Sequence, residues 1–384
     1  MSIANHFAPP AGGASPLGRT PVISVTALAG VPAFVRDAFG DPVHRAASKA
    51  AMLDIEAIED QDCFIPHRTL AGYLDAVAHL GGEPEFGLLL APCLSLARYG
   101  CWGRYILGAP TLGAALERAR STVAYHSKGD AVAVDVQGDR ARISYASAAA
   151  GLAGYRHVAS GSAGVIASLC RAYLPEGWRP LAIELDLPTP PLPQRFEEAF
   201  GCPVHFDAPR VAVWLAAECL QQRPAQRLPP QPLLTVHDLA RARIECHRLR
   251  SATDVVAQQL WAQVLSGAVS IDSAACALAT SVRTLQRELK REGTDFRSLA
   301  NALRARRATE LLSASDATVT QISAALGYAA PAHFARAFRK TTGRSPQEFR
   351  ERELQQSSAT PTAAPDRARS AMRPAGGPSR SGVR

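Results

Sequence analysis

The stretch LGYAAPAHFARAFRKTTGRSPQEFR, residues 326–350, restricts the fold of this chain more than any other segment. Its apolar start indicates the end of a short helix, and Gly327 can adopt the left-handed conformation that terminates one. Pro331 has a fixed φ that suits the first turn of a second helix. That second helix places Phe334 and Phe338 on one face and its basic residues elsewhere. A helix, a glycine turn and a basic helix together predict a helix-turn-helix, whose second helix enters the major groove of DNA.

The residue types in this stretch are more specific than its helical pattern. A leucine–glycine–aromatic turn and a Phe-x-Arg-Ala-Phe segment are followed in register by Gly343, Ser345-Pro346 and Phe349-Arg350. In these residues the stretch closely resembles the signature of the AraC/XylS family of bacterial transcription regulators. The resemblance implies a bipartite DNA-binding domain, double-stranded promoter DNA and RNA polymerase as partners, and a small-molecule effector whose identity is unknown.

A second, weaker copy of the pattern occurs 49 residues earlier, at residues 281–293 (SVRTLQRELKREG). Its apolar residues Leu285 and Leu289 align with Phe334 and Phe338, and its basic residues align as well. An internal repeat of this kind predicts two DNA-reading helices, each preceded by a short helix. The four aligned apolar residues are assigned to the core.

A long helical segment, residues 295–313, joins the two copies. At 1.5 Å per residue it spans roughly 28 Å, which is near the ~34 Å between successive major-groove faces of B-DNA. The sequence therefore predicts that one chain presents two recognition helices to adjacent grooves.

The first turns of the two recognition helices supply the candidates for base reading. Arginine pairs bidentately with guanine, and glutamine with adenine. The predicted base readers are Arg283, Thr284, Gln286, Arg287, His333 and Arg336. Basic residues further along should touch phosphates, which sets register and salt dependence rather than sequence preference. They are Lys290, Arg291, Arg339, Lys340 and Arg344. For any single residue of this set, an ordinary solvated position is the alternative.

Two departures from the family pattern affect these helices. Ala279 stands where the first turn usually has glycine, so a left-handed alanine there costs about 1 kcal/mol unless the turn differs. The second recognition helix opens with alanines instead of a serine cap, which costs about 1 kcal/mol, partly offset by Pro331. We therefore expect the first helix to supply most base readout, and the second mainly phosphate anchoring and thymine-methyl contacts.

Residues 22–220 mix two periodicities and predict an α+β domain. Helices are predicted at 68–79, 111–125 and 156–173, and strands at 131–136, 141–145, 181–187 and 211–215, the first two strands forming a hairpin through Gly138-Asp139. Through residues 110–116 (PTLGAAL) and 200–206 (FGCPVHF), this region resembles the "arabinose-binding" N-terminal domain carried by one branch of the family. The resemblance implies a domain that binds an effector and that can form a homodimer. The name of the family's domain does not by itself establish a sugar ligand.

Polar-tipped aromatic residues are the candidates for an effector pocket, with core packing as the alternative for each. They are Trp102, Tyr105, Tyr125, Tyr145, Tyr155 and Trp178.

The remaining segments complete the predicted organisation. Residues 1–21 are predicted to be a disordered leader, residues 221–250 a linker with a connector helix, residues 251–352 the DNA-binding domain, and residues 353–384 a disordered basic tail. The net charge of +8 is zero over residues 1–250 and +5 over residues 251–350, which favours an anionic partner for the C-terminal third.

Eight cysteines show neither Cys-x-x-Cys pairs nor zinc spacing, so they are interpreted as buried free thiols in a reducing cytoplasm, with a redox or metal sensor as the alternative. An alkyl-transfer DNA-repair enzyme would need a zinc–thiolate cluster. The sequence also lacks a Gly-rich phosphate loop, His-Glu-x-x-His and Gly-x-Ser-x-Gly. We therefore predict no enzyme, no cofactor, no metal and no membrane span. A ligand-free architectural DNA binder is a further alternative, but it would leave the N-terminal domain without a task.

Overall fold

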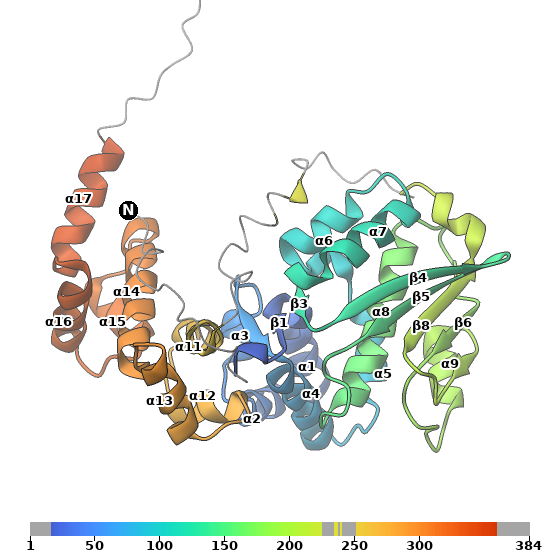
Figure 1. Ribbon diagram of the computed structural model, residues 1–384, viewed down its shortest axis with the longest axis horizontal. Helices are drawn as coiled ribbons and strands as arrows, with labels where there is room; N and C mark the ends of the chain where they lie inside the picture. Colours follow the sequence, from blue (N-terminus) through green and yellow to red (C-terminus); the bar gives the residue numbers. More distant parts are fainter. Residues whose placement is uncertain (1–16, 225–233, 237–238, 240–250, 359–384) are drawn as a thin grey trace, which may run out of the picture.

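The computed structural model describes residues 17–224, 234–236, 239 and 251–358, and Figure 1 shows two parts built from them. The first part, residues 17–224, contains two β-sheets and helices α1 to α9, and the second consists of helices α11 to α17. The α+β class predicted for the N-terminal domain and the all-α class predicted for the C-terminal domain are therefore confirmed.

A small antiparallel sheet of the N-terminal domain lies nearest to the helical C-terminal part (Figure 1). Its strand order is β2–β1–β3, and Ile23 in the central strand pairs with Ile65 and Ser127. The strands are β1 (Val22–Ser24), β2 (Phe64–Pro66) and β3 (Ser127–Lys128).

A larger sheet has the order β4–β5–β8–β6–β7, in which only the short β6–β7 pair is parallel among the described strands. The predicted hairpin is confirmed, because Gln137 pairs with Arg140 across a two-residue turn and Gly138 has a φ of +61°. The strands are β4 (Ala131–Gln137), β5 (Arg140–Ala146), β6 (Ala182–Glu184), β7 (Val204–His205) and β8 (Val211–Ala216). β6 is shorter than the predicted 181–187, because only its three residues pair with β8.

Helix α8 is the central helix of the N-terminal domain and contacts α4, α5 and β8. Its glycines allow very close packing, since a Cβ on Gly164 would lie 2.3 Å from the carbonyl oxygen of Ala91. The three helices predicted at 68–79, 111–125 and 156–173 correspond to α4, α7 and α8. The bounds are α1 (Val31–Phe39), α2 (Asp41–Ala50), α3 (Ile55–Ile58), α4 (His67–Gly81), α5 (Phe86–Leu90), α6 (Gly100–Leu107), α7 (Leu112–Thr122), α8 (Tyr155–Arg171) and α9 (Gln194–Phe200).

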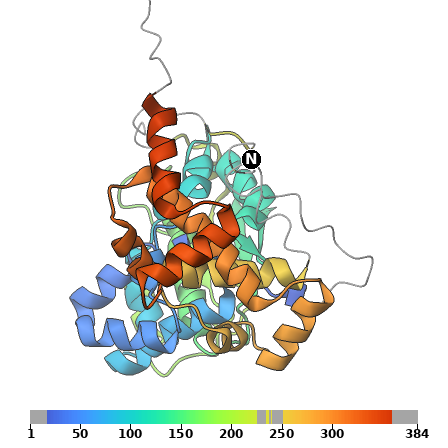
Figure 2. The ribbon, with the colours of Figure 1, turned by 90° about the vertical axis from the view of Figure 1, so that its left-hand side faces the viewer.

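The C-terminal helices form two helix-turn-helix units on either side of one long helix, as the repeat predicts. Figure 2 views the molecule from the side of these helices. The bounds are α11 (Ala252–Leu265), α12 (Ile271–Ala277), α13 (Val282–Arg291), α14 (Phe296–Ala314), α15 (Val319–Ala325), α16 (Pro331–Thr342) and α17 (Pro346–Ser358).

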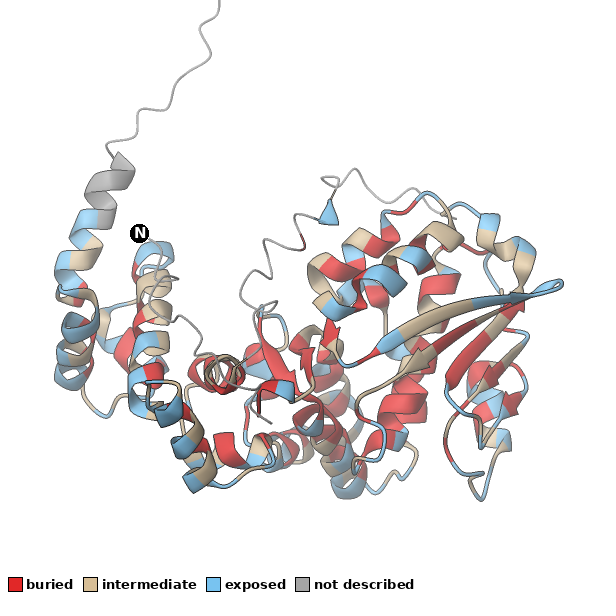
Figure 3. Ribbon diagram, viewed as in Figure 1, coloured by how far each residue is buried: buried red, intermediate tan, exposed pale blue. Residues whose placement is uncertain are grey.

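Helix α11 joins the two parts of the molecule. It is buried around most of its circumference, as its red and tan colour in Figure 3 shows. It packs against α14 on the C-terminal side and against β2, α3 and the 3-10 turn Leu17–Arg19 on the N-terminal side. Apolar residues Leu17 and Phe64 lie in one buried cluster with Val255 and Leu260 of α11.

Two predictions about the ends of the chain are wrong in part. The predicted leader is structured from Leu17 onward, because Leu17 packs on α11 and Lys128 Nζ donates to the carbonyl of Gly18 at 2.7 Å. The predicted disordered tail begins too early, since α17 continues to Ser358. The connector helix and most of the linker lie outside the described residues, as does Cys246.

The prediction of buried thiols holds for only some of the cysteines. Cys63, Cys170 and Cys202 are buried, but Cys93 and Cys276 are exposed, because each lies on the outward side of a short helix. Among the described cysteines none is in a disulfide, and the described residues contain no cluster of three potential metal ligands. No helix in the described part of the chain has the length and apolarity needed to cross a bilayer.

Candidate nucleic-acid interface and ligand cavity

Helix α13 is the first predicted recognition helix, and its local sequence determines both where it starts and which face it buries. The Ser281 side chain caps it by accepting from the Thr284 N–H at 3.1 Å. Leu285 and Leu289 are fully buried, as predicted, so the opposite face is exposed. Arg283, Gln286, Arg287, Lys290 and Arg291 are exposed on that face, whereas Thr284 is half-buried.

The exposed cations of α13 differ in whether they form ion pairs with a neighbouring carboxylate. Arg291 pairs with Glu288 at 2.9 Å, and Arg287 lies 3.7 Å from the same carboxylate. Thr284 Oγ1 accepts from the Ser281 hydroxyl at 2.9 Å, which holds this side chain toward the cap. Arg283 and Gln286, in the first two turns of α13, are therefore the residues best placed to reach a base edge.

Helix α16 has the predicted core and the predicted weak start. Phe334 and Phe338 are each 1% exposed, and their rings lie 5.6 Å apart between centroids. The ring of Phe349, from α17, meets Phe338 edge-on at 5.8 Å, although Phe349 itself is only half-buried. The N-cap position, Ala330, makes no side-chain hydrogen bond. The exposed candidates on and after this helix are His333, Arg336, Arg339, Lys340 and Arg344.

Helix α14 holds the two recognition helices in one unit. Its 19 residues give a length of roughly 28 Å, and it contacts both α11 and α16. Its arginines are engaged within the protein: Arg304 lies 5.0 Å above the Tyr328 ring and Arg306 lies 4.5 Å above the Trp261 ring. These two cations therefore stabilise the joint between the helices.

A second site, an apolar cavity of ≈ 110 Å³, lies inside the N-terminal domain. Its walls come from α4, α6, α7, α8 and the β4–β5 hairpin. Three aromatic rings line it nearly in parallel: Trp102 and His126 lie 4.6 Å apart at 6°, and Tyr99 lies 4.7 Å from His126 at 20°. The Trp102 indole N–H is satisfied by Thr122 Oγ1 at 2.9 Å.

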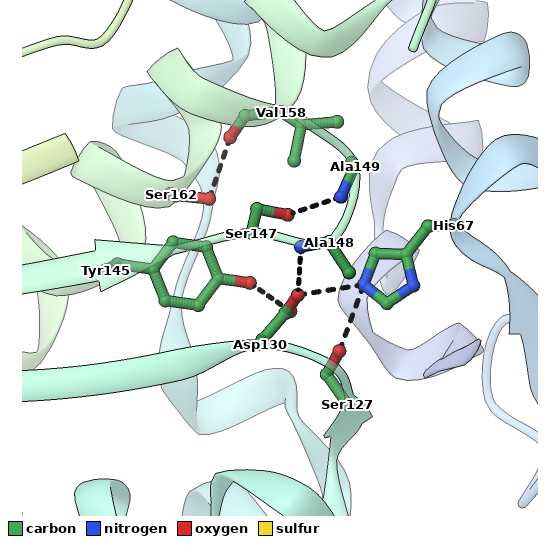
Figure 4. A network of polar contacts seen from close by, with 9 residues as sticks. All are labelled: His67, Ser127, Asp130, Tyr145, Ser147, Ala148, Ala149, Val158 and Ser162. Atoms are coloured by element: carbon green, nitrogen blue, oxygen red, sulfur yellow. Dashed lines mark hydrogen bonds and ion pairs between the residues drawn. The ribbon is translucent and has the colours of Figure 1, made fainter. Parts of the chain in front are cut away.

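The cavity meets a buried polar network at Tyr145 (Figure 4). The Tyr145 hydroxyl donates to one carboxylate oxygen of Asp130, while the other oxygen accepts from the Ala148 N–H at 2.7 Å. That second oxygen also lies 3.1 Å from His67 Nε2, which is 3.0 Å from the Ser127 hydroxyl.

The network sets the charge of Asp130. Burial by itself raises the pKa of this carboxyl, but the interactions with His67, Ser127 and Tyr145 outweigh it and lower the pKa to about 2. Since His67 directly follows β2 and Ser127 lies on β3, the network ties the cavity to the small sheet that packs beside α11.

The cavity brings together only part of the predicted effector set. Trp102 and Tyr145 line it, but Tyr105, Tyr125, Tyr155 and Trp178 do not. Tyr105 lies under the Arg118 guanidinium at 4.7 Å, and the Tyr155 hydroxyl donates to Asp186 at 2.7 Å. The sequence did not indicate four lining residues with polar side chains: Tyr99, His126, His157 and Ser162. Tyr99 and His126 lie outside the predicted helices and strands, so no pattern in the sequence indicates that they point inward.

Comparison with known proteins identifies the two domains that contain these sites. Residues 40–224 match the family model described as the arabinose-binding domain of AraC transcription regulator, N-terminal, and residues 274–352 match a helix-turn-helix domain. The chain belongs to the AraC family of transcription regulators.

Similar proteins differ in how much of this chain they match. The ornithine utilization regulator of Pseudomonas aeruginosa is 26% identical over 79% of this chain and 91% of its own length. The HTH-type transcriptional activator RhaS of Escherichia fergusonii is 41% identical over 22% of this chain and 31% of its own length. A solved structure of the regulator CdpR from Pseudomonas aeruginosa covers 69% of this chain and 86% of its own, at 23% identity and a TM-score of 0.32.

The turns before the two recognition helices differ in one residue: the first has Ala279 and the second has Gly327. Ala279 has a φ of +51° and Gly327 a φ of +72°, and both turns are closed by equivalent backbone hydrogen bonds. A Cβ on Gly327 would lie 2.6 Å from the carbonyl oxygen of Gly267, so glycine is needed there for space as well. Ala279 is therefore strained only in its backbone.

Replacing Ala279 by Gly should relieve that strain. A left-handed alanine costs about 1–2 kcal/mol. Glycine removes this cost, but it also makes the unfolded chain more flexible, which offsets part of the stabilisation. We expect Ala279→Gly to raise the free energy of unfolding by up to about 1 kcal/mol, measured by urea denaturation. The matched change Ala332→Gly, at an exposed site in the first turn of α16, should lower it by about 0.5–1 kcal/mol. A decrease in both variants would contradict the strain.

Proposed function

We propose that this AraC-family DNA-binding transcription regulator reads base sequence mainly through α13 and uses α16 chiefly to anchor the protein on phosphates. One contrast carries the proposal. The first five residues of α13, Val282 to Gln286, expose Arg283 and Gln286, which can pair bidentately with guanine and adenine. The first five residues of α16, Pro331 to Ala335, include only one polar side chain, that of His333, which is exposed.

The length of α14 supports a bipartite mode of binding. Its roughly 28 Å is close to the ~34 Å spacing of major-groove faces. Two recognition helices held at its ends can therefore lie in adjacent grooves on one side of the duplex.

The division of labour is tested by measuring affinity for a promoter fragment and for base-substituted copies of it. We expect Arg283→Ala and Gln286→Ala to lose about 1–3 kcal/mol of discrimination at the contacted base pair, while still binding nonspecific DNA. Arg339→Ala should weaken binding to all sequences alike and reduce the salt slope by about 1. An equal loss of discrimination in both classes of variant would reject the proposal.

The regulatory role extends the proposal to the N-terminal domain. We infer that its cavity binds a small-molecule effector and that the protein activates transcription with RNA polymerase in the cytoplasm, with a homodimer as one possible functional form. The effector role is supported by the position of the cavity next to the small sheet β2–β1–β3, which packs against α11. The relatives named above are described as transcription regulators, which favours this role over a catalytic one.

A further inference from the structure

The chemistry of the cavity lining narrows the class of molecule that can bind there. No Asp, Glu, Lys or Arg is among the described residues that line it. A charged group that enters such a site loses its hydration without gaining a partner, which strongly disfavours its binding. The lining therefore selects against amino acids and carboxylates.

Most polar groups of the lining already have partners within the protein. The Trp102 indole N–H donates to Thr122, the Tyr145 hydroxyl donates to Asp130, and the Ser162 hydroxyl donates to the Val158 carbonyl at 2.8 Å. A sugar has a hydroxyl on nearly every carbon, and few of them would find a hydrogen bond here. The lining therefore selects against polyols too, because a buried hydroxyl without a hydrogen bond weakens binding.

Three titratable residues of the lining, His157, Tyr99 and Tyr145, add no charge at neutral pH. Burial lowers the pKa of His157 to about 4, and its Nδ1 accepts from the Gly87 N–H at 3.2 Å, so the neutral ring carries its proton on Nε2. Burial and the nearby Asp130 carboxylate both raise the pKa of Tyr99 and of Tyr145, so both phenols stay protonated.

One corner of the cavity is polar. The hydroxyls of Tyr99 and Tyr145 are both near Asp130. The Tyr145 hydroxyl donates to Asp130 and accepts from Ser147, which leaves it one acceptor lone pair. In the described part of the chain no hydrogen bond uses the Tyr99 hydroxyl, which can donate or accept. This corner can meet one hydrogen-bonding group of a ligand.

The size and shape of the cavity point to a planar body. Its volume of ≈ 110 Å³ is of the order of the ~150 Å³ engineered apolar cavity that binds benzene. The near-parallel rings of Tyr99, Trp102 and His126 form an aromatic wall against which another ring can pack.

We propose that the effector is a compact, uncharged and mostly apolar molecule, about the size of a substituted benzene ring, with one hydrogen-bonding group at the Tyr99–Tyr145 corner. This inference rests on the proposal that the N-terminal cavity is the effector site. It predicts that neither the sugar suggested by the family's domain name nor the amino acid in a relative's name is the ligand.

The test uses the full-length protein at neutral pH and five probes: benzyl alcohol, toluene, benzoate, L-ornithine and L-arabinose. Binding is measured by saturation-transfer NMR and by the shift in thermal midpoint. We expect millimolar benzyl alcohol and toluene to bind and raise the midpoint. Benzoate, which has a ring of the same size and a charge, should bind at least about tenfold more weakly, and ornithine and arabinose should not bind.

Variants locate the binding in the cavity. Val165→Phe fills it and should abolish binding, whereas Val136→Phe, the same change on a 58%-exposed residue of β4, should not. Tyr99→Phe should weaken benzyl alcohol several-fold and leave toluene unchanged. Because this variant removes only a hydroxyl, it keeps the test decisive if Val165→Phe does not fold.

Two results would overturn the inference. One is binding of arabinose, ornithine or benzoate that Val165→Phe removes, which would keep the effector site and reject the ligand class. The other is no binding of either apolar probe to the wild-type protein. DNA binding by the same samples is measured by fluorescence anisotropy with a labelled promoter fragment. Failure of the proposed function would appear there as absence of sequence-specific DNA binding, whereas the two results above concern the ligand alone.

Discussion

Replacing Asp130 by Ala is expected to lower the free energy of unfolding by about 3–5 kcal/mol. The Asp130 side chain is fully buried and accepts from the Tyr145 hydroxyl and the Ala148 N–H, beside His67. Without it these buried groups lose their partner, and each unpaired group costs about 1–3 kcal/mol. Urea denaturation of both proteins measures the difference.

A matched control lies five residues away. Asp135→Ala removes the same carboxyl from an exposed position of β4, so its effect should stay within about 0.5 kcal/mol. Similar losses in the two variants would show that the buried network contributes nothing special.

The same carboxyl predicts a pH dependence of stability. The pKa of Asp130 is lowered to about 2 in the folded protein, below the value of about 3.9 in an unfolded chain. A depressed pKa stabilises the folded state above the unfolded pKa, and this contribution is lost as the pH falls toward 2. As the pH falls from about 5 to 2, the free energy of unfolding should therefore decrease by about 2 kcal/mol less in Asp130→Ala than in the wild-type protein.

Replacing Phe338 by Ala is expected to destabilise the second helix-turn-helix by about 3–5 kcal/mol. This side chain is 1% exposed and contacts the rings of Phe334 and Phe349, so its loss leaves a cavity between α16 and α17. Because α16 then no longer packs firmly, affinity for all DNA sequences should fall as well. Circular dichroism during urea denaturation and anisotropy with labelled DNA measure the two effects.

Lys340→Ala, on the exposed side of the same helix, separates packing from charge. It should leave stability within about 0.5 kcal/mol and reduce the salt slope of DNA binding by about 1. If Lys340→Ala destabilised the protein as much as Phe338→Ala, the assignment of Phe338 to the core of this unit would be wrong.

Local signals made the DNA-binding domain predictable. Ser281 and Pro331 mark the starts of α13 and α16, and Gly327 marks the turn before the second, so the helices are found within a few residues of their predicted bounds. The β4–β5 hairpin was predictable for the same reason, because its turn residues and its alternation are adjacent in the sequence.

Features that depend on distant contacts were not predictable. Leu17 follows a Pro- and Gly-rich segment, and nothing nearby indicates that α11 would bury it. Tyr105 and Tyr145 look alike as sequence candidates, but only Tyr145 faces the cavity, because the packing of four helices against the hairpin decides which rings point inward. Core packing, the alternative for each of these aromatics, describes Tyr155, which is buried, whereas Tyr105 is only half-buried.

The position of α11 also bears on how such proteins can be recombined. Val255 and Leu260 share a buried cluster with Leu17 and Phe64, so the first helix of the DNA-binding domain is completed by residues from the start of the chain. A chimaera joined only at the linker would pair this helix with a foreign surface. Exchange of sensor domains between family members would thus require that residues 17–24 and 64–66 of the new domain fit the α11 that they cover. The N-terminal and C-terminal domains therefore cannot be exchanged independently of each other.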